Sequence, residues 1–79
     1  MSETVDAGAV IDALGGVPNI ESVEACITRL RITVADPGRV DGDALRAAGA
    51  MAVITVAQTV QVVVGHEADA LTAEIAARL

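Results

Sequence analysis

The chain has no Phe, Tyr or Trp and no Lys among its 79 residues. Without aromatic rings, it has no stacking platform for bases or sugars. Its five Arg stand against 11 Asp and Glu, which gives a formal net charge of −6. Nucleic acid requires a basic surface, which this composition does not provide. The two absences together exclude the nucleic-acid-binding classes.

Cysteine is almost absent as well. One Cys cannot form an intramolecular disulfide, which is typical of a reducing compartment. The chain begins without a signal peptide's basic and apolar regions, and no apolar run approaches the ~18 residues of a membrane span. We therefore expect a single stand-alone cytoplasmic domain over residues 1–79, with residues 1–4 frayed. No cofactor is expected, and no metal, because there is no second His or Cys and no ordered carboxylate pattern.

Apolar residues make up 53% of the chain, enough to fill a small core built from Ala, Val, Ile and Leu. Helical spacing predicts a first helix over Val5–Leu14, ended by Gly15-Gly16. A second is predicted from about Asp41 to Ala48, with Asp41 as N-cap, and a third over roughly Glu67–Leu79. The positions predicted to be buried in the first and third helices are Ala7, Val10, Ile11, Leu14, Ala68, Leu71, Ile75 and Leu79.

Two pairs of β-branched runs lie between these helices and predict two hairpins. The first joins Ile20–Cys26 to Arg29–Ala35. The second joins Ala50–Val56 to Val60–Val64 through the turn Ala57-Gln58-Thr59. The order is αββαββα, an α+β fold. The apolar pattern predicts one four-stranded antiparallel sheet with three helices packed on one face and the other face solvated.

The first hairpin gathers reactive side chains. Pairing through Ile27-Thr28 places Cys26 opposite Arg29 and Glu24 opposite Arg31, and all four then share the solvated face. Ile-Thr is poor chemistry for a two-residue turn, which favours Gly, Asn or Asp. A wider connection, with Cys26 on the loop, is therefore the alternative.

A thiol beside guanidinium groups has defined chemistry. Nearby cations favour the thiolate, and paired Arg donors bind a phosphoryl dianion, so a Cys-phosphate could split one transfer into two steps. The plainer reading is an inert packing Cys next to an exposed R-x-R strand. A non-enzymatic module that binds a small anion or acts in regulation remains an alternative. A redox sensor is disfavoured because there is no resolving cysteine.

The segment Asn19–Arg31, N-I-E-S-V-E-A-C-I-T-R-L-R, resembles a known phosphorylation signature. It is that of the enzyme IIB domain in the glucose and N-acetylglucosamine class of the bacterial phosphoenolpyruvate-dependent sugar phosphotransferase system. The resemblance extends over nearly the whole chain, to Gly65. Relatives usually carry Gly and Asn in the second hairpin turn, where this chain has Ala57-Gln58-Thr59.

The resemblance implies a phosphocarrier whose catalytic residues are Cys26, Arg29 and Arg31. Cys26 would take a phosphoryl group from a phosphohistidine on a IIA protein. It would pass that group to a sugar, N-acetylglucosamine or glucose by preference, bound by the membrane-embedded IIC permease. The paired arginines would assist transfer to the sugar. The domain would then work at the inner face of the membrane through IIC, without inserting into it.

Further residues are candidates for secondary roles. Thr28 and Ile27 lie within the signature, and Ile27 with Met51 is a candidate docking rim for IIA. Gln61 lies on a strand and could face the site, although a solvated strand position is the simpler expectation. His66, at the start of the last helix, is expected to be an exposed residue rather than part of a phosphoryl relay.

Overall fold

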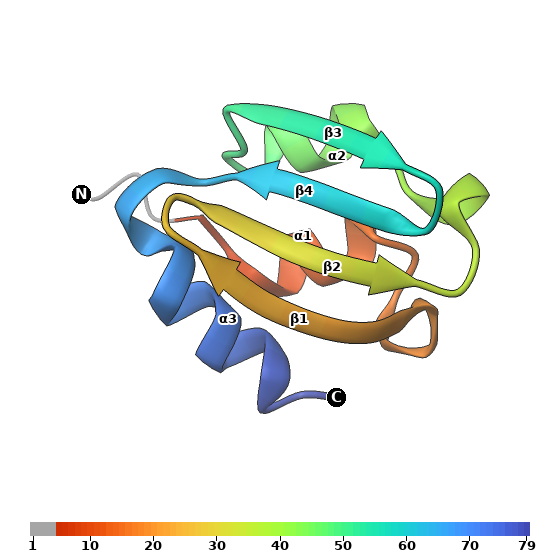
Figure 1. Ribbon diagram of the computed structural model, residues 1–79, viewed down its shortest axis with the longest axis horizontal. Coiled ribbons are helices and arrows are strands. Elements are labelled where there is room, and N and C mark those ends of the chain that lie inside the picture. The colour runs from red at the N-terminus through yellow and green to blue at the C-terminus, as the bar shows by residue number, and fades with distance from the viewer. Residues whose placement is uncertain (1–4) are drawn as a thin grey trace.

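The computed structural model describes residues 5–79, so the expected fraying of residues 1–4 lies outside the described residues. The predicted αββαββα order is confirmed, with short 3₁₀ turns at Val17–Asn19, Pro37–Arg39 and Gly65–Glu67 (Figure 1). The helices and strands are α1 Ala7–Ala13, β1 Ile20–Cys26, β2 Arg29–Val34, α2 Gly42–Ala47, β3 Ala52–Val56, β4 Thr59–Val63 and α3 Ala68–Ala76.

The four strands form one antiparallel sheet in the order β1-β2-β4-β3. In Figure 1, α1 and α2 lie behind the sheet and α3 runs along β1. The covered face carries the core, to which β2 and β4 contribute the fully buried Leu30, Ile32, Val60 and Val62. Because side chains alternate along a strand, the residues between these four lie on the opposite, open face.

The helices begin and end slightly inside their predicted bounds. The first starts at Ala7 rather than Val5, because the Asp6 side chain caps it by accepting a hydrogen bond from the Gly8 N–H. Val5 is buried in the core instead, and its N–H donates to Glu67 Oε1 at 3.0 Å. Asp41 caps α2 as predicted, accepting from the Ala44 N–H at 3.0 Å.

The last helix differs from its prediction at its end. It stops at Ala76, and the N–H groups of Arg78 and Leu79 donate to carbonyls three residues back. Such bonds tighten the final turn and rotate the side chains that follow. Leu79 is consequently 48% exposed, so its predicted burial is wrong, whereas Ala68, Leu71 and Ile75 are buried as predicted.

The second hairpin turns more tightly than predicted. Thr59 pairs with Val56, which leaves the two residues Ala57-Gln58 in the turn and moves the start of β4 one residue earlier. Ala57 has φ 54°, a conformation that Gly or Asn adopts more readily. Its neighbour Gln58 explains the difference, because Gln58 Nε2 donates to the carbonyls of Val34 and Ala35 and fixes the turn against β2.

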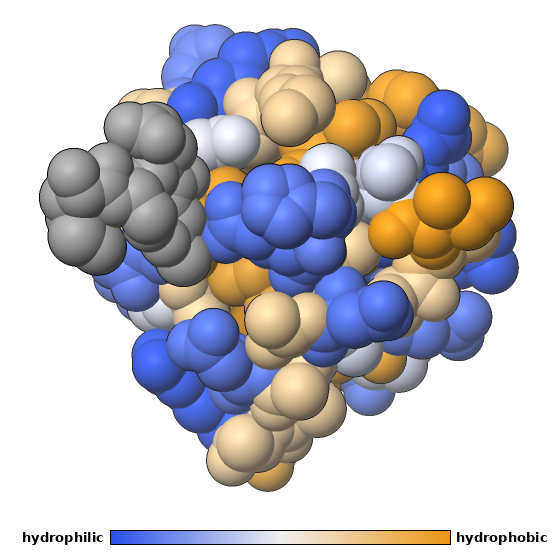
Figure 2. Space-filling model, turned by 90° about the vertical axis from the view of Figure 1, so that its left-hand side faces the viewer, coloured by the Kyte–Doolittle hydropathy of each residue, from blue (hydrophilic) through white to orange (hydrophobic). Residues whose placement is uncertain are grey.

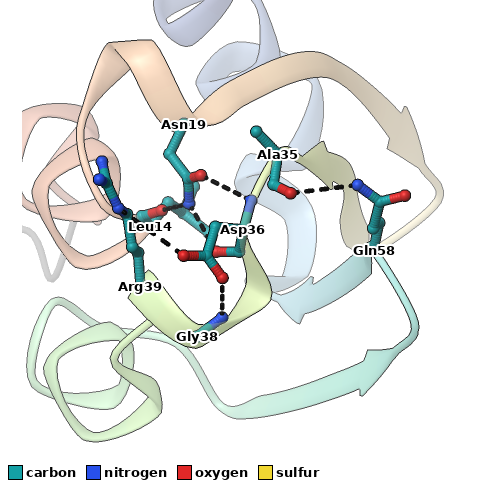
Figure 3. Close-up of polar contacts among 7 residues, drawn as sticks. All are labelled: Leu14, Asn19, Ala35, Asp36, Gly38, Arg39 and Gln58. Atoms are coloured by element: carbon teal, nitrogen blue, oxygen red, sulfur yellow. Dashed lines mark hydrogen bonds and ion pairs between the residues drawn. The ribbon is translucent and has the colours of Figure 1, made fainter.

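A buried asparagine holds together the end of the molecule away from the β1–β2 turn (Figure 3). Asn19 is 2% exposed, and its Nδ2 donates to the carbonyls of Leu14 at 2.7 Å and Asp36 at 3.0 Å. Its Oδ1 accepts from the Asp36 N–H at 2.8 Å. One side chain thus joins the end of α1 to the loop that follows β2.

None of the helices in residues 5–79 has the length and hydrophobicity needed to cross a membrane. The longest, α3, has nine residues.

Candidate functional site

The β1–β2 turn lies at one end of the sheet, on the left of Figure 1. Cys26, the last residue of β1, pairs with Arg29, the first residue of β2, and Glu24 pairs with Arg31. The predicted register is therefore confirmed. The alternative of a wider connection is wrong, because only Ile27 and Thr28 separate the strands.

The backbone of this turn is strained at its first residue. Ile27 has φ 60°, in the left-handed region that Gly or Asn adopts more readily. A β-branched residue in this conformation costs on the order of 1–3 kcal/mol. The Ile27 side chain is 89% exposed, so packing does not offset the strain.

Hydrogen bonds from a distant segment fix the turn instead. The Thr28 carbonyl accepts from the N–H groups of Val64 at 2.9 Å and Gly65 at 3.0 Å, where the chain leaves β4. Gly65 has φ 76°, which allows the chain to bend there, and a Cβ at this position would lie 3.2 Å from Met51 Cε. The end of β4 thereby holds the residues that follow Cys26 in place.

Two rows of side chains cross the open face at this end. Residues paired across neighbouring strands stand side by side on the same face. The first row runs through Cys26, Arg29, Val63 and Ala52, and the second through Glu24, Arg31, Gln61 and Ile54. Polar residues thus occupy the β1–β2 side of the open face, and apolar residues occupy the β3 side.

Arg31 connects the thiol to a carboxylate. Its Nη2 donates to Cys26 Sγ at 3.5 Å, and its Nη1 lies 3.7 Å from Glu24 Oε1. The two charged side chains remain 46% and 65% exposed, while Cys26 is half-buried. A guanidinium beside the sulfur stabilises negative charge there, whether a thiolate or the oxygens of a group bound to it.

Arg29 has a different partner. It stands directly opposite Cys26 in the ladder, yet its Nη1 donates to Gln61 Oε1 at 2.9 Å. Gln61 is a half-buried residue on the open face of β4, and its hydrogen bond to Arg29 is exposed. A role for it in the site stays a prediction. The structure thus gives the two predicted arginines different partners, a carboxylate for Arg31 and a neutral amide for Arg29.

Exposed apolar residues flank this group of side chains. Ile27 and Met51, 89% and 71% exposed, belong to the same end of the sheet, because the Met51 N–H donates to Val63 O. Figure 2 views the molecule from this end, where hydrophobic and hydrophilic surfaces lie next to each other. His66 is exposed in the 3₁₀ turn Gly65–Glu67, as expected. That Ile27 and Met51 form a docking rim stays a prediction.

A pocket of about 380 Å³ lies away from the hairpin, between α1 and α2 on the covered side of the sheet. Alanines and the carboxylates of Asp12 and Asp41 line it. Within residues 5–79, no three His, Cys, Asp or Glu side chains lie close enough to hold a metal ion. The pocket is thus separate from the group around Cys26, which lies on the open face of the sheet.

The chain is similar to known proteins over most of its length. The family model described as phosphotransferase system, EIIB matches residues 8–41, a span that includes Cys26 and both arginines. The N-acetylglucosamine-specific EIIB component of the phosphotransferase system of Streptomyces coelicolor is 48% identical over 69 residues, which is 87% of this chain and 90% of that protein. The chain belongs to the EIIB family of the phosphotransferase system. The predicted resemblance is confirmed, and the chain is a sugar phosphotransferase component.

A second relative and one solved structure are also similar to this EIIB chain. The glucosamine-specific EIICBA component of Bacillus subtilis is 46% identical over 66 residues, which is 84% of this chain but only 10% of that protein. A domain of the IIabc component from Clostridium difficile superposes with a TM-score of 0.77 at 22% identity, covering 92% of this chain and 77% of that one. This last similarity supports the fold alone.

Proposed function

We propose that Cys26 is the phosphoryl carrier of this EIIB chain. It accepts a phosphoryl group from a phosphohistidine on a IIA protein and passes it to a sugar bound by a IIC permease. The observation that carries the proposal is the Arg31 Nη2 donor 3.5 Å from Cys26 Sγ, at the exposed end of the sheet. A cysteine at this end can meet one protein to accept the group and another to release it.

The two transfers balance as follows. In the first, the electron pair of the Cys26 thiolate forms the S–P bond while the P–N bond of the phosphohistidine breaks. The histidine nitrogen leaves with the electron pair of the P–N bond and takes up a proton. In the second, a sugar hydroxyl oxygen forms the O–P bond while the S–P bond breaks. The Cys26 sulfur leaves with the S–P electron pair as a thiolate, and the hydroxyl proton passes to solvent. Splitting the transfer at sulfur replaces one difficult step with two easier ones.

The two arginines assist at different stages. Arg31 already donates to the sulfur, so it stabilises the attacking thiolate and then the oxygens of the bound phosphoryl group. Arg29 is held by the neutral Gln61 side chain in an exposed setting, from which it can move to the phosphoryl oxygens without leaving a charge unpaired. Thr28 and Ile27 support the site through the turn geometry rather than through chemistry.

For the sugar we propose N-acetylglucosamine, with glucose as the runner-up. The S. coelicolor relative named as N-acetylglucosamine-specific matches 90% of its own length to this chain. The B. subtilis relative, named EIICBA and glucosamine-specific, supports EIIA and EIIC as partner classes. Through a IIC partner, this chain would act beside the membrane without entering it.

A mass measurement tests the proposal. Incubation of the EIIB chain with phosphoenolpyruvate, the general phosphotransferase proteins and a IIA protein should add ~80 Da, the mass of one phosphoryl group. Adding IIC-containing membranes and N-acetylglucosamine should remove that mass and yield the sugar phosphate. A module that only binds anions would gain no covalent mass, and that result would refute the proposal.

Replacing Arg29 with Lys should separate the two transfers. Lysine keeps the charge but lacks the planar fork that can bind two phosphoryl oxygens at once. We expect sugar phosphorylation to fall about 10- to 100-fold, with a smaller effect on phosphoryl acceptance at Cys26. Rapid-quench kinetics of each half-reaction provide the measurement.

Arg46→Lys is the matched control, because Arg46 is an exposed α2 residue paired with Asp43 and lies outside the open face. It should leave both rates unchanged. Equal losses in both half-reactions for Arg29→Lys would contradict the assigned division of roles.

A further inference from the structure

Glu24 is the acidic member of the polar group on the open face. It lies two residues before Cys26 on β1, and its Oε1 is 3.7 Å from Nη1 of the same guanidinium whose Nη2 donates to Cys26 Sγ. The carboxylate and the sulfur thus share a single cation, each through its own guanidinium nitrogen. A carboxylate at this place repels a phosphoryl group, so phosphate binding alone does not explain its presence.

We propose that Glu24 is a positioning residue that keeps the phosphoryl group on Cys26 transferable, by holding part of the charge of Arg31. The inference rests on the proposed function of Cys26 and deepens it. Glu24 exchanges no atom in either transfer. It acts through Arg31, whose guanidinium it orients before the phosphoryl group arrives and for which it competes afterwards.

The electrostatic argument compares two states of Cys26. When Cys26 is a free thiol, Glu24 pairs with Arg31 and no second negative charge is bound at the sulfur. With a bound phosphoryl dianion, the same carboxylate stands close to two further negative charges, and both acceptors require Arg31. Glu24 therefore raises the free energy of the phosphorylated state relative to the free state.

The exposure of the Glu24–Arg31 ion pair limits its effect on the phosphoryl-exchange equilibrium. Both partners of the ion pair are about half exposed, and exposed pairs change an equilibrium constant by about fivefold at most. A shift of this size suits a relay, because an intermediate that binds its phosphoryl group too tightly would pass it on slowly. Glu24 would set the balance between accepting the group and releasing it.

Glu21 provides a matched comparison on the same strand. It is an exposed carboxylate at the irregularity between Ile20 and Ser22, where the β1–β2 register shifts and Glu21 has no partner residue in the ladder. It lies farther from Cys26 along β1. Removing its charge changes the net charge by the same amount without touching Arg31.

The test measures the equilibrium of phosphoryl exchange between phosphorylated IIA and the full EIIB chain, using purified proteins and mass spectrometry. Glu24→Gln should raise the equilibrium constant toward phosphorylated EIIB about fivefold and slow release to the sugar by a similar factor. Glu24→Asp, which keeps the charge, should stay near the unchanged protein. Glu21→Gln should have no effect.

A spectroscopic measurement reports on the same charge. In ³¹P NMR titrations of the phosphorylated chain, the step to the dianion should move to lower pH in Glu24→Gln and remain in place in Glu21→Gln. An unchanged or reduced equilibrium constant for Glu24→Gln, with normal mass gain, would overturn the inference alone. Absence of mass gain in the unsubstituted chain would instead overturn the function on which it rests.

Discussion

Cys26→Ser should gain no phosphoryl mass and should support no sugar phosphorylation. A serine hydroxyl loses its proton far less readily than a thiol, and the side chains around Cys26 provide cations rather than a free base. The carboxylate nearby, Glu24, already pairs with Arg31. Loss of a nucleophile lowers turnover by about a thousandfold or more, which is the largest functional effect expected in this chain.

The fold should survive this substitution, because serine is close in size to cysteine and the position is only half-buried. Circular dichroism and the unfolding midpoint should therefore match those of the unsubstituted chain. His66→Gln is the appropriate companion, since His66 is another residue able to carry a phosphoryl group in residues 5–79. If Cys26→Ser still gained ~80 Da while His66→Gln did not, the carrier assignment would be wrong.

Much of the open face could be predicted because strand register follows from alternation. A shift of one residue would expose Leu30 and Ile32 and bury Arg31, so the apolar pattern specified that Arg31 lies on the open face with Cys26, while the two-residue connection set which residues pair. The ion pair between Glu24 and Arg31 follows directly from that register.

The tightness of the turn could not be predicted in the same way. Local preferences disfavour Ile27 at φ 60°, and the bonds that hold it there come from Val64 and Gly65, far along the chain. The role of Gln61 was also hidden, because it depends on β4 lying next to β2. Alternation placed Gln61 on the open face, away from the buried valines of its own strand. Only the strand order brings it next to Arg29.

The burial of the Asn19 side chain could not be predicted from the sequence either. Its position before the first predicted strand indicated a connector, and nothing in the local pattern showed that its side chain would be buried. The side chain forms three hydrogen bonds with the backbone of Leu14 and Asp36 (Figure 3). The Asn19 backbone N–H donates to the Gly16 carbonyl, and its carbonyl accepts from the Ala35 N–H. Such a network becomes visible only when the end of α1 and the loop after β2 are brought together.

Asn19→Ala should therefore cause a large loss of stability without affecting the chemistry at Cys26. Removing the side chain leaves the buried Leu14 carbonyl without its hydrogen bond, at a cost of about 1–3 kcal/mol. It also takes a part-buried bond from the N–H of Asp36 and another from its carbonyl, which still accepts from the Arg39 N–H. We expect the free energy of unfolding to fall by about 2–4 kcal/mol, the sum of one buried unsatisfied carbonyl and two partly exposed bonds. A domain of this size has a total of roughly 4–12 kcal/mol, so the loss is a large share. Urea denaturation followed by circular dichroism provides the measurement.

Gln58→Ala is the control that distinguishes the effect of burial on stability from the effect of losing hydrogen bonds alone. Gln58 Nε2 also donates to two backbone carbonyls, those of Val34 and Ala35, but its side chain is exposed. Water can replace these donors, so the loss should stay below about 1 kcal/mol. Equal losses for the two variants would show that burial of Asn19 is not what makes its bonds valuable. Because Asn19 directly precedes β1 and Cys26 is the last residue of that strand, the two lie at opposite ends of it, and folded Asn19→Ala protein should still accept the phosphoryl group at the normal rate.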